Sequence, residues 1–190
     1  RKKALIDFSK KHNLKIGTIA DLINYRIFNE QTVKRLESKS VKTEHGKFNL
    51  ILYKDLIFEE THIVLQKGRI SKNTSTLVRV QQSNLYHDLL NVDEFGSRWS
   101  ISDAMKKINK AGSGIILLID GDDNKENEFK EIRVSKKKRK TIPNNDPRRI
   151  GIGSQILRDL GVKKIKLMGN EVRYPSLSGF DLEVTEYIKK

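Results

Sequence analysis

The N-terminal part of the chain changes from a helical to a strand-like distribution of apolar residues. Over residues 4–12 apolar positions recur at helical spacing, and Asn13 follows as a stop. Thr18 can cap a second helix over residues 19–25, because its hydroxyl oxygen can accept a hydrogen bond from an N–H group of the first turn. From Thr32 onward apolar residues are interleaved with Thr, Ser and Lys, which favours strands.

Three β-rich segments follow at short spacing. His45-Gly46 has the composition of a hairpin turn, and the apolar run after it predicts a strand. Closely spaced strands of this kind favour an antiparallel sheet or barrel. The predicted strands cover residues 48–53, 61–65 and 76–80.

The second half of the chain alternates between helical and strand patterns. Ser100 can cap a helix that ends at Gly112, and a buried strand over residues 115–119 follows it. A second helix is predicted over residues 151–160, opening on two glycines and ending at Gly161. Two further strands are predicted at residues 164–168 and 181–187, with a loop containing Pro175 between them.

This order of elements predicts an α+β fold, with a mixed, mostly antiparallel sheet and flanking helices. Residues 1–31 form a helical lead-in, and residues 32–190 form one domain. An acidic stretch followed by the basic run at residues 136–140 predicts a mobile loop from about residue 121 to 147. The basic run is more typical of a solvated loop than of a docking site.

The amino-acid composition limits the classes of protein to which the chain can belong. The chain has 190 residues, 36% hydrophobic and 33% charged, which suits one polar globular domain. The absence of cysteine excludes disulfides, thiolate zinc sites and cysteine nucleophiles. No apolar run approaches membrane-spanning length and no secretory signal opens the chain, so we expect a cytoplasmic protein without a membrane partner.

The net charge of +14 favours a polyanionic partner such as nucleic acid or a phosphorylated small molecule. The basic residues are spread along the whole chain, however, and no zinc-finger, RNA-binding or basic-zipper pattern accompanies them. Nucleic acid is therefore an unfavoured partner.

One C-terminal run carries a resemblance to a known family. Residues 146–162 read DPRRIGIGSQILRDLGV, which resembles the signature of GTP cyclohydrolase II, the enzyme that opens GTP in the first step of riboflavin synthesis. Residues 77–80 and 95–97 resemble two further segments of that family. Residues 15–26 resemble the closing segment of 3,4-dihydroxy-2-butanone 4-phosphate synthase, a domain often fused in front of GTP cyclohydrolase II. The resemblance implies a GTP cyclohydrolase II-like fold.

The same resemblance implies that the family's zinc site has been lost. The family holds zinc with three cysteines, and their positions fall on Asn84, Ser100 and Ser102. Neutral amide and hydroxyl groups are poor zinc ligands, so no metal or other cofactor is expected there. His87 and Asp88 lie nearby but do not make a convincing replacement site.

A few candidate site residues remain. The resemblance implies catalytic roles for Asp146 and Arg148, as vestiges, and phosphate binding by Arg79 and Arg173. Alternatively Asp146 caps the next turn and Arg148 pairs with a carboxylate, which we favour. Where the family binds guanine, residues 120–124 are acidic. An unpaired acidic loop is favoured there over a Mg²⁺ site.

Gly151 and Gly153 at the predicted helix start permit close packing, and they would also let a phosphate approach the free N–H groups there. Two glycines are a weak indication of phosphate binding by themselves.

The leading hypothesis is a riboflavin-biosynthesis protein whose GTP cyclohydrolase II-like domain has lost GTP ring opening. The domain would act as a structural or regulatory homodimer unit behind a synthase domain. Two alternatives stay open: residual binding or hydrolysis of a nucleotide phosphate through Asp146, Arg148 and Arg173, and a basic module for nucleic acid.

Overall fold

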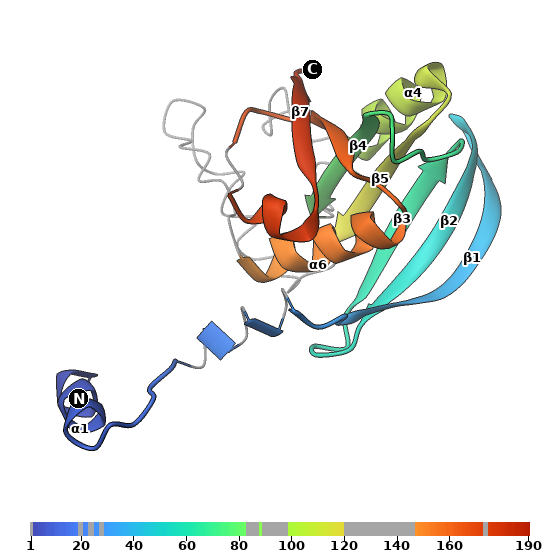
Figure 1. Ribbon diagram of the computed structural model, residues 1–190. Helices are drawn as coiled ribbons and strands as arrows, with labels where there is room; N and C mark the ends of the chain where they lie inside the picture. Colours follow the sequence, from blue (N-terminus) through green and yellow to red (C-terminus); the bar gives the residue numbers. More distant parts are fainter. Residues whose placement is uncertain are drawn as a thin grey trace, which may run out of the picture.

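The strands of the domain form one seven-stranded sheet in the order β1-β2-β3-β5-β4-β6-β7 (Figure 1). The computed structural model describes residues 2–18, 21–22, 25–26, 29–82, 88, 99–119, 147–172 and 175–190. The strands are β1 (Val33–Thr43), β2 (Gly46–Asp55), β3 (Thr61–Lys67), β4 (Thr76–Gln82), β5 (Gly114–Ile119), β6 (Lys164–Met168) and β7 (Glu183–Ile188).

The sheet has an antiparallel and a parallel half. The pairs β1/β2, β2/β3 and β3/β5 are antiparallel, whereas β4/β5, β4/β6 and β6/β7 are parallel. Parallel neighbours need long crossovers, which the helices α4 (Ile101–Ala111) and α6 (Pro147–Asp159) and the 3-10 helix η3 (Pro175–Phe180) supply. The predicted α+β class is confirmed, and the antiparallel character belongs to the first half of the sheet.

The predicted caps of α4 are confirmed. The Ser100 hydroxyl accepts a hydrogen bond from the N–H of Asp103 at 3.1 Å, and Gly112 ends the helix at φ 79°. A residue with a β-carbon rarely adopts this left-handed conformation, so the glycine suits the C-cap. Ala104 and Ile108 are the buried residues of this helix.

Helix α6 begins four residues earlier than the sequence predicted. It opens at Pro147, whose fixed φ and missing N–H suit the first helical position. Gly151 and Gly153 therefore lie inside the helix, and both are buried. Their N–H groups are not those of a free helix start, so the helix bounds do not support phosphate binding by these glycines and agree with the packing role. A β-carbon on Gly153 would lie 3.2 Å from Ile119 Cδ1.

Hydrophobic cores lie on both faces of the sheet. On one face α6 contributes Ile152, Ile156 and Leu157 to a large cluster with the inward side chains of the strands. On the other face Ala104 and Ile108 of α4 pack with another cluster of side chains. The central strand β5 is almost entirely buried, as expected for a strand covered on both sides. The helices thereby fix the strand ends that carry the candidate site.

The N-terminal lead-in lies apart from the sheet (Figure 1). Helix α1 (Lys2–Lys11) ends just before Asn13, which has a positive φ of 51°, and this confirms the predicted stop. Thr18 Oγ1 accepts a hydrogen bond from Asp21 N at 3.0 Å, as predicted for a cap. Leu5, Phe8 and other apolar side chains of the lead-in are more than half exposed. No helix in the described ranges is long and apolar enough to span a membrane.

Candidate functional site

The carboxyl ends of β4 and β5 meet the start of α6 at one edge of the sheet. Gln82 at the end of β4 is paired with Ile119 at the end of β5 and accepts a hydrogen bond from Arg149 of α6. Ligands of open α/β sheets bind outside the carboxyl ends of parallel strands. We therefore take this edge as the candidate site.

Ser100 and Ser102 are both engaged in contacts of the protein. The Ser100 hydroxyl donates to Asp103 Oδ2 at 2.9 Å, in addition to its capping contact. The Ser102 hydroxyl lies 2.8 Å from His45 Nε2. Glu44 lies 2.8 Å from the same ring nitrogen, so these three side chains do not form a relay across both nitrogens of an imidazole, as a hydrolase triad requires.

Arg79 of β4 binds two backbone carbonyl groups. Its Nη1 donates to the carbonyl oxygen of Met168 at 2.8 Å and its Nη2 to that of Trp99 at 3.3 Å. Its Nε donates to Gln81 Oε1 at 2.9 Å. Arg79 thus joins β4 to the end of β6 and to the segment before α4. Its role in phosphate binding stays a prediction.

Gln81 extends this network to helix α4. Its amide nitrogen donates to both carboxylate oxygens of Asp88 at 3.0 Å. Asp88 Oδ1 also lies 3.4 Å from the N–H of Ile101, in the first turn of α4, where a negative charge is favourable. These hydrogen bonds link Asp88 to strand β4 and to the first turn of α4.

Arg148 lies in the first turn of α6, against the loop between β2 and β3. Its guanidinium forms an ion pair with Glu60 and stacks over the ring of Phe58, 3.4 Å from the ring centroid. Both partners of the ion pair are about three-quarters buried. The predicted pairing of Arg148 with a carboxylate is thereby confirmed. Asn84, His87, Asp146 and Arg173, together with residues 120–124 and 136–140, lie outside the described residues.

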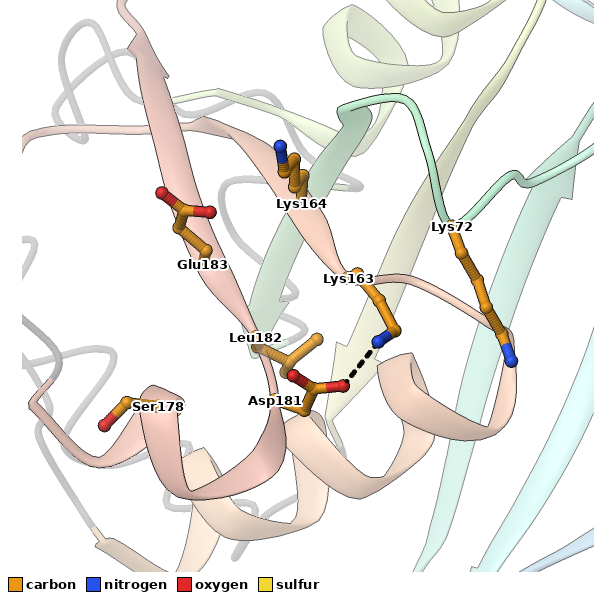
Figure 2. Close-up of a pocket in the computed structure, with 7 residues that line it drawn as sticks. All are labelled: Lys72, Lys163, Lys164, Ser178, Asp181, Leu182 and Glu183. Atoms are coloured by element: carbon orange, nitrogen blue, oxygen red, sulfur yellow. Dashed lines mark ion pairs between the residues drawn. The ribbon is translucent and has the colours of Figure 1, made fainter.

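A surface pocket of about 300 Å³ lies at the other end of the parallel strands (Figure 2). Lys163 and Asp181 form an ion pair of 2.8 Å across it, and this pairing lowers the pKa of Asp181. Lys164 and Glu183 stand at the amino ends of β6 and β7, where ligands are not expected in this architecture. None of the sequence-predicted site residues lines this pocket.

Comparison with known proteins decides the family. The family model for GTP cyclohydrolase II matches residues 34–189. The chain belongs to the GTP cyclohydrolase II family. A 3,4-dihydroxy-2-butanone 4-phosphate synthase from Pseudomonas aeruginosa is 41% identical over 99% of the chain and 52% of its own length. The riboflavin biosynthesis protein RibBA of Aquifex aeolicus is 37% identical over 97% of the chain and 48% of its own length.

A solved structure agrees with this assignment. The crystal structure of RibBX, a two-domain 3,4-dihydroxy-2-butanone 4-phosphate synthase from A. baumannii, matches the whole chain with a TM-score of 0.61 and 36% identity. The match covers 50% of the RibBX chain. This GTP cyclohydrolase II domain therefore spans about half the length of the relatives it matches.

The described residues do not fit the zinc ion of the GTP cyclohydrolase II family. A three-cysteine site supplies thiolates, whereas Ser100 and Ser102 offer neutral hydroxyl groups. Ser100 Oγ already accepts the first-turn N–H of α4, and Ser102 Oγ faces His45. Both hydroxyl groups would have to give up these contacts to approach a metal.

The signature helix of the family holds two distant parts of this chain in place. Gln155 Oε1 accepts hydrogen bonds from the N–H and the hydroxyl of Thr32, at 2.8 and 3.3 Å, where the lead-in enters the sheet. Asp159 Oδ2 accepts from Tyr53 at 2.5 Å and from Arg35 at 2.9 Å. The sequence predicts neither role. The available signal was two polar residues, four positions apart, on a helix whose neighbouring positions are apolar.

Tyr53 gives a test of this network. Burial raises the pKa of its hydroxyl well above the usual value, and the hydrogen bond to Asp159 acts in the same direction. The neutral phenol therefore stabilises the fold below about pH 10, the pKa of an unfolded tyrosine, and this contribution is lost as pH rises toward the folded pKa. We expect the melting temperature to fall above about pH 10, and to fall less in Tyr53→Phe. An equal fall in melting temperature above about pH 10 in the parent and in Tyr53→Phe would contradict this prediction.

Proposed function

We propose that this chain is the C-terminal half of a two-domain 3,4-dihydroxy-2-butanone 4-phosphate synthase of riboflavin biosynthesis, and that it does not open GTP. The names of the relatives from P. aeruginosa and A. baumannii support the first part, since each is about twice as long as this chain. The relative from A. aeolicus is named a riboflavin biosynthesis protein, which supports the assignment to this pathway.

One observation carries the second part of the proposal. Ser100 and Ser102 stand where the resemblance places two family zinc ligands, and their hydroxyl groups are held by the cap of α4 and by His45. In the family, ring opening uses a zinc-bound water, and neither serine offers the thiolate that such a site needs. Arg79 and Arg148 add to this support, because their guanidinium groups are engaged with carbonyl groups and with Glu60.

We infer that the domain has a structural or regulatory role toward the synthase domain that precedes it. The lead-in supports this, because Leu5, Phe8, Leu22 and Tyr25 are more than half exposed in this chain. Burial of these apolar side chains against a neighbouring domain would be favourable, because it removes apolar surface from water. The proposal includes a homodimer of the two-domain protein, for which light scattering after size exclusion should give twice the mass of one chain.

GTP turnover tests the loss of ring opening. We expect the purified chain, supplied with GTP and Zn²⁺, to release no formate above the enzyme-free background. A GTP cyclohydrolase II that retains its three cysteines, assayed in parallel, should release formate. Repeated turnover of GTP by this chain would overturn the proposal.

A second assay tests the assignment to the synthase independently of the loss of GTP ring opening. The full-length protein should convert ribulose 5-phosphate into 3,4-dihydroxy-2-butanone 4-phosphate, and deletion of residues 32–190 should alter the rate or the thermal stability of the remainder. A full-length protein without synthase activity would refute the assignment even if GTP stays intact. Saturable heat on titration with GTP, without formate, would revive the hypothesis of residual nucleotide binding.

A further inference from the structure

Three potential metal ligands gather where β2 turns into β3. One ligand atom from each of Asp55, Glu60 and His62 lies within 4.8 Å of the other two. Asp55 and His62 are 1% and 0% exposed, whereas the Glu60 side chain is 25% exposed. The cluster therefore lies inside the protein, with Glu60 at its solvent side.

The hairpin itself brings these side chains together. His62 pairs with Tyr53, and Asp55 follows Tyr53 by two residues, so Asp55 lies on the same face of β2 as Tyr53. The N–H of Asp55 donates to the carbonyl of Glu60 at 2.9 Å and closes the turn. Asp55 Oδ1 accepts the N–H of Ile57 at 2.7 Å, which orients the carboxylate. The arrangement is thus held by backbone contacts.

The charges of the three side chains favour the binding of a cation. Asp55 Oδ2 is buried and accepts no hydrogen bond from the described residues. A buried carboxylate oxygen without a partner costs free energy. Arg148 supplies one positive charge, through its ion pair with Glu60, against two carboxylates. With a neutral imidazole, the side chains of Asp55, Glu60, His62 and Arg148 together carry one excess negative charge.

We propose that Asp55, Glu60 and His62 bind a divalent transition-metal ion of the Zn²⁺ or Mn²⁺ class. One imidazole nitrogen and two carboxylates suit these ions better than Ca²⁺ or Mg²⁺, which favour oxygen ligands alone. Bonds of about 2.0–2.2 Å put two ligand atoms at most about 4.4 Å apart. The three ligand atoms already lie within 4.8 Å of one another, so binding requires only a small approach of the side chains. Three protein ligands leave positions for water.

None of these three ligands stands at a position that the resemblance assigns to a family cysteine, and the site does not depend on the proposed function. None of its ligands comes from the signature helix, which contributes only Arg148 as a neighbouring cation. The ion would fix the β2–β3 turn against the start of α6, because Glu60 is shared between the ion and Arg148.

Metal titration of the untagged 190-residue chain tests the proposal. We expect saturable binding of one Zn²⁺ or Mn²⁺ ion by calorimetry, and visible absorption bands when Co²⁺ is bound. Glu60→Gln should weaken binding at least about tenfold, since it removes a ligand charge. Glu59→Gln is the matched control, because it makes the same change one residue away, and it should bind like the parent. Ser102→Ala should also bind like the parent.

Arg148→Met should change the metal affinity in the direction opposite to Glu60→Gln. Removal of its positive charge should tighten metal binding, whereas a site elsewhere on the chain would not respond. Thermal unfolding in EDTA shows whether each variant is folded. A folded parent chain that takes up no ion, or equal binding by the parent and Glu60→Gln, would overturn the proposal.

Discussion

Ile156→Ala is expected to lower the free energy of unfolding by about 2–5 kcal/mol. Ile156 is 0% exposed in the middle of α6 and belongs to the core that joins this helix to the sheet. Truncation to alanine removes buried apolar surface and leaves a cavity, because neighbouring side chains relax only in part. Urea unfolding followed by circular dichroism measures the loss.

Arg158→Ala is the matched control for this prediction. It lies two residues further along the same helix and is exposed, so its replacement should change stability by no more than about 0.5 kcal/mol. Equal effects of the two variants would refute the conclusion that the signature helix is retained for packing.

Arg148→Met is expected to lower the free energy of unfolding by about 1–3 kcal/mol. Methionine keeps much of the apolar contact with Phe58 but loses the ion pair with Glu60, which leaves a largely buried carboxylate without its counter-charge. The loss should shrink when Glu60 is also replaced by glutamine. A double-mutant cycle of unfolding free energies measures this coupling.

The Arg148→Met variant also distinguishes a structural role of Arg148 from a role in nucleotide binding. If Arg148 acts only through Glu60 and Phe58, the stability falls and no nucleotide chemistry changes. Unaltered stability, with a loss of nucleotide binding in Arg148→Met, would restore a functional role for the residue. The observed contacts favour the structural role.

Predictions from the sequence succeeded where a few neighbouring residues determine the structure. The limits of α4 follow from the hydroxyl of Ser100 and the left-handed conformation of Gly112, both of which act within one helical turn. The predicted start of α6 is wrong because Pro147 occupies the first helical position, where its fixed φ is favourable, and Gly151 lies one turn inside the helix. The glycines instead serve a packing contact with β5, which lies far away in sequence.

The candidate site was predicted in part. The replacement of family zinc ligands by Ser100 and Ser102 stays a prediction from the resemblance, whereas the cap formed by Ser100 follows from its position and is confirmed. The partner of Arg148 was predicted only as a carboxylate, because nothing local selects Glu60 among the acidic residues. The role of Arg79 between two backbone carbonyls was not predicted, since both carbonyls belong to other segments.

By itself the sequence determined the family, the class of fold, most strands and helices, and the absence of cysteine. These features depend on periodicity, caps and residue identity, which act over short distances along the chain. Only the tertiary structure decided that Gln155 holds Thr32, 123 residues away, and that Arg148 meets the Asp55, Glu60 and His62 cluster. Such contacts arise because the sheet order and the crossing of α6 bring distant segments together, and no local pattern specifies them.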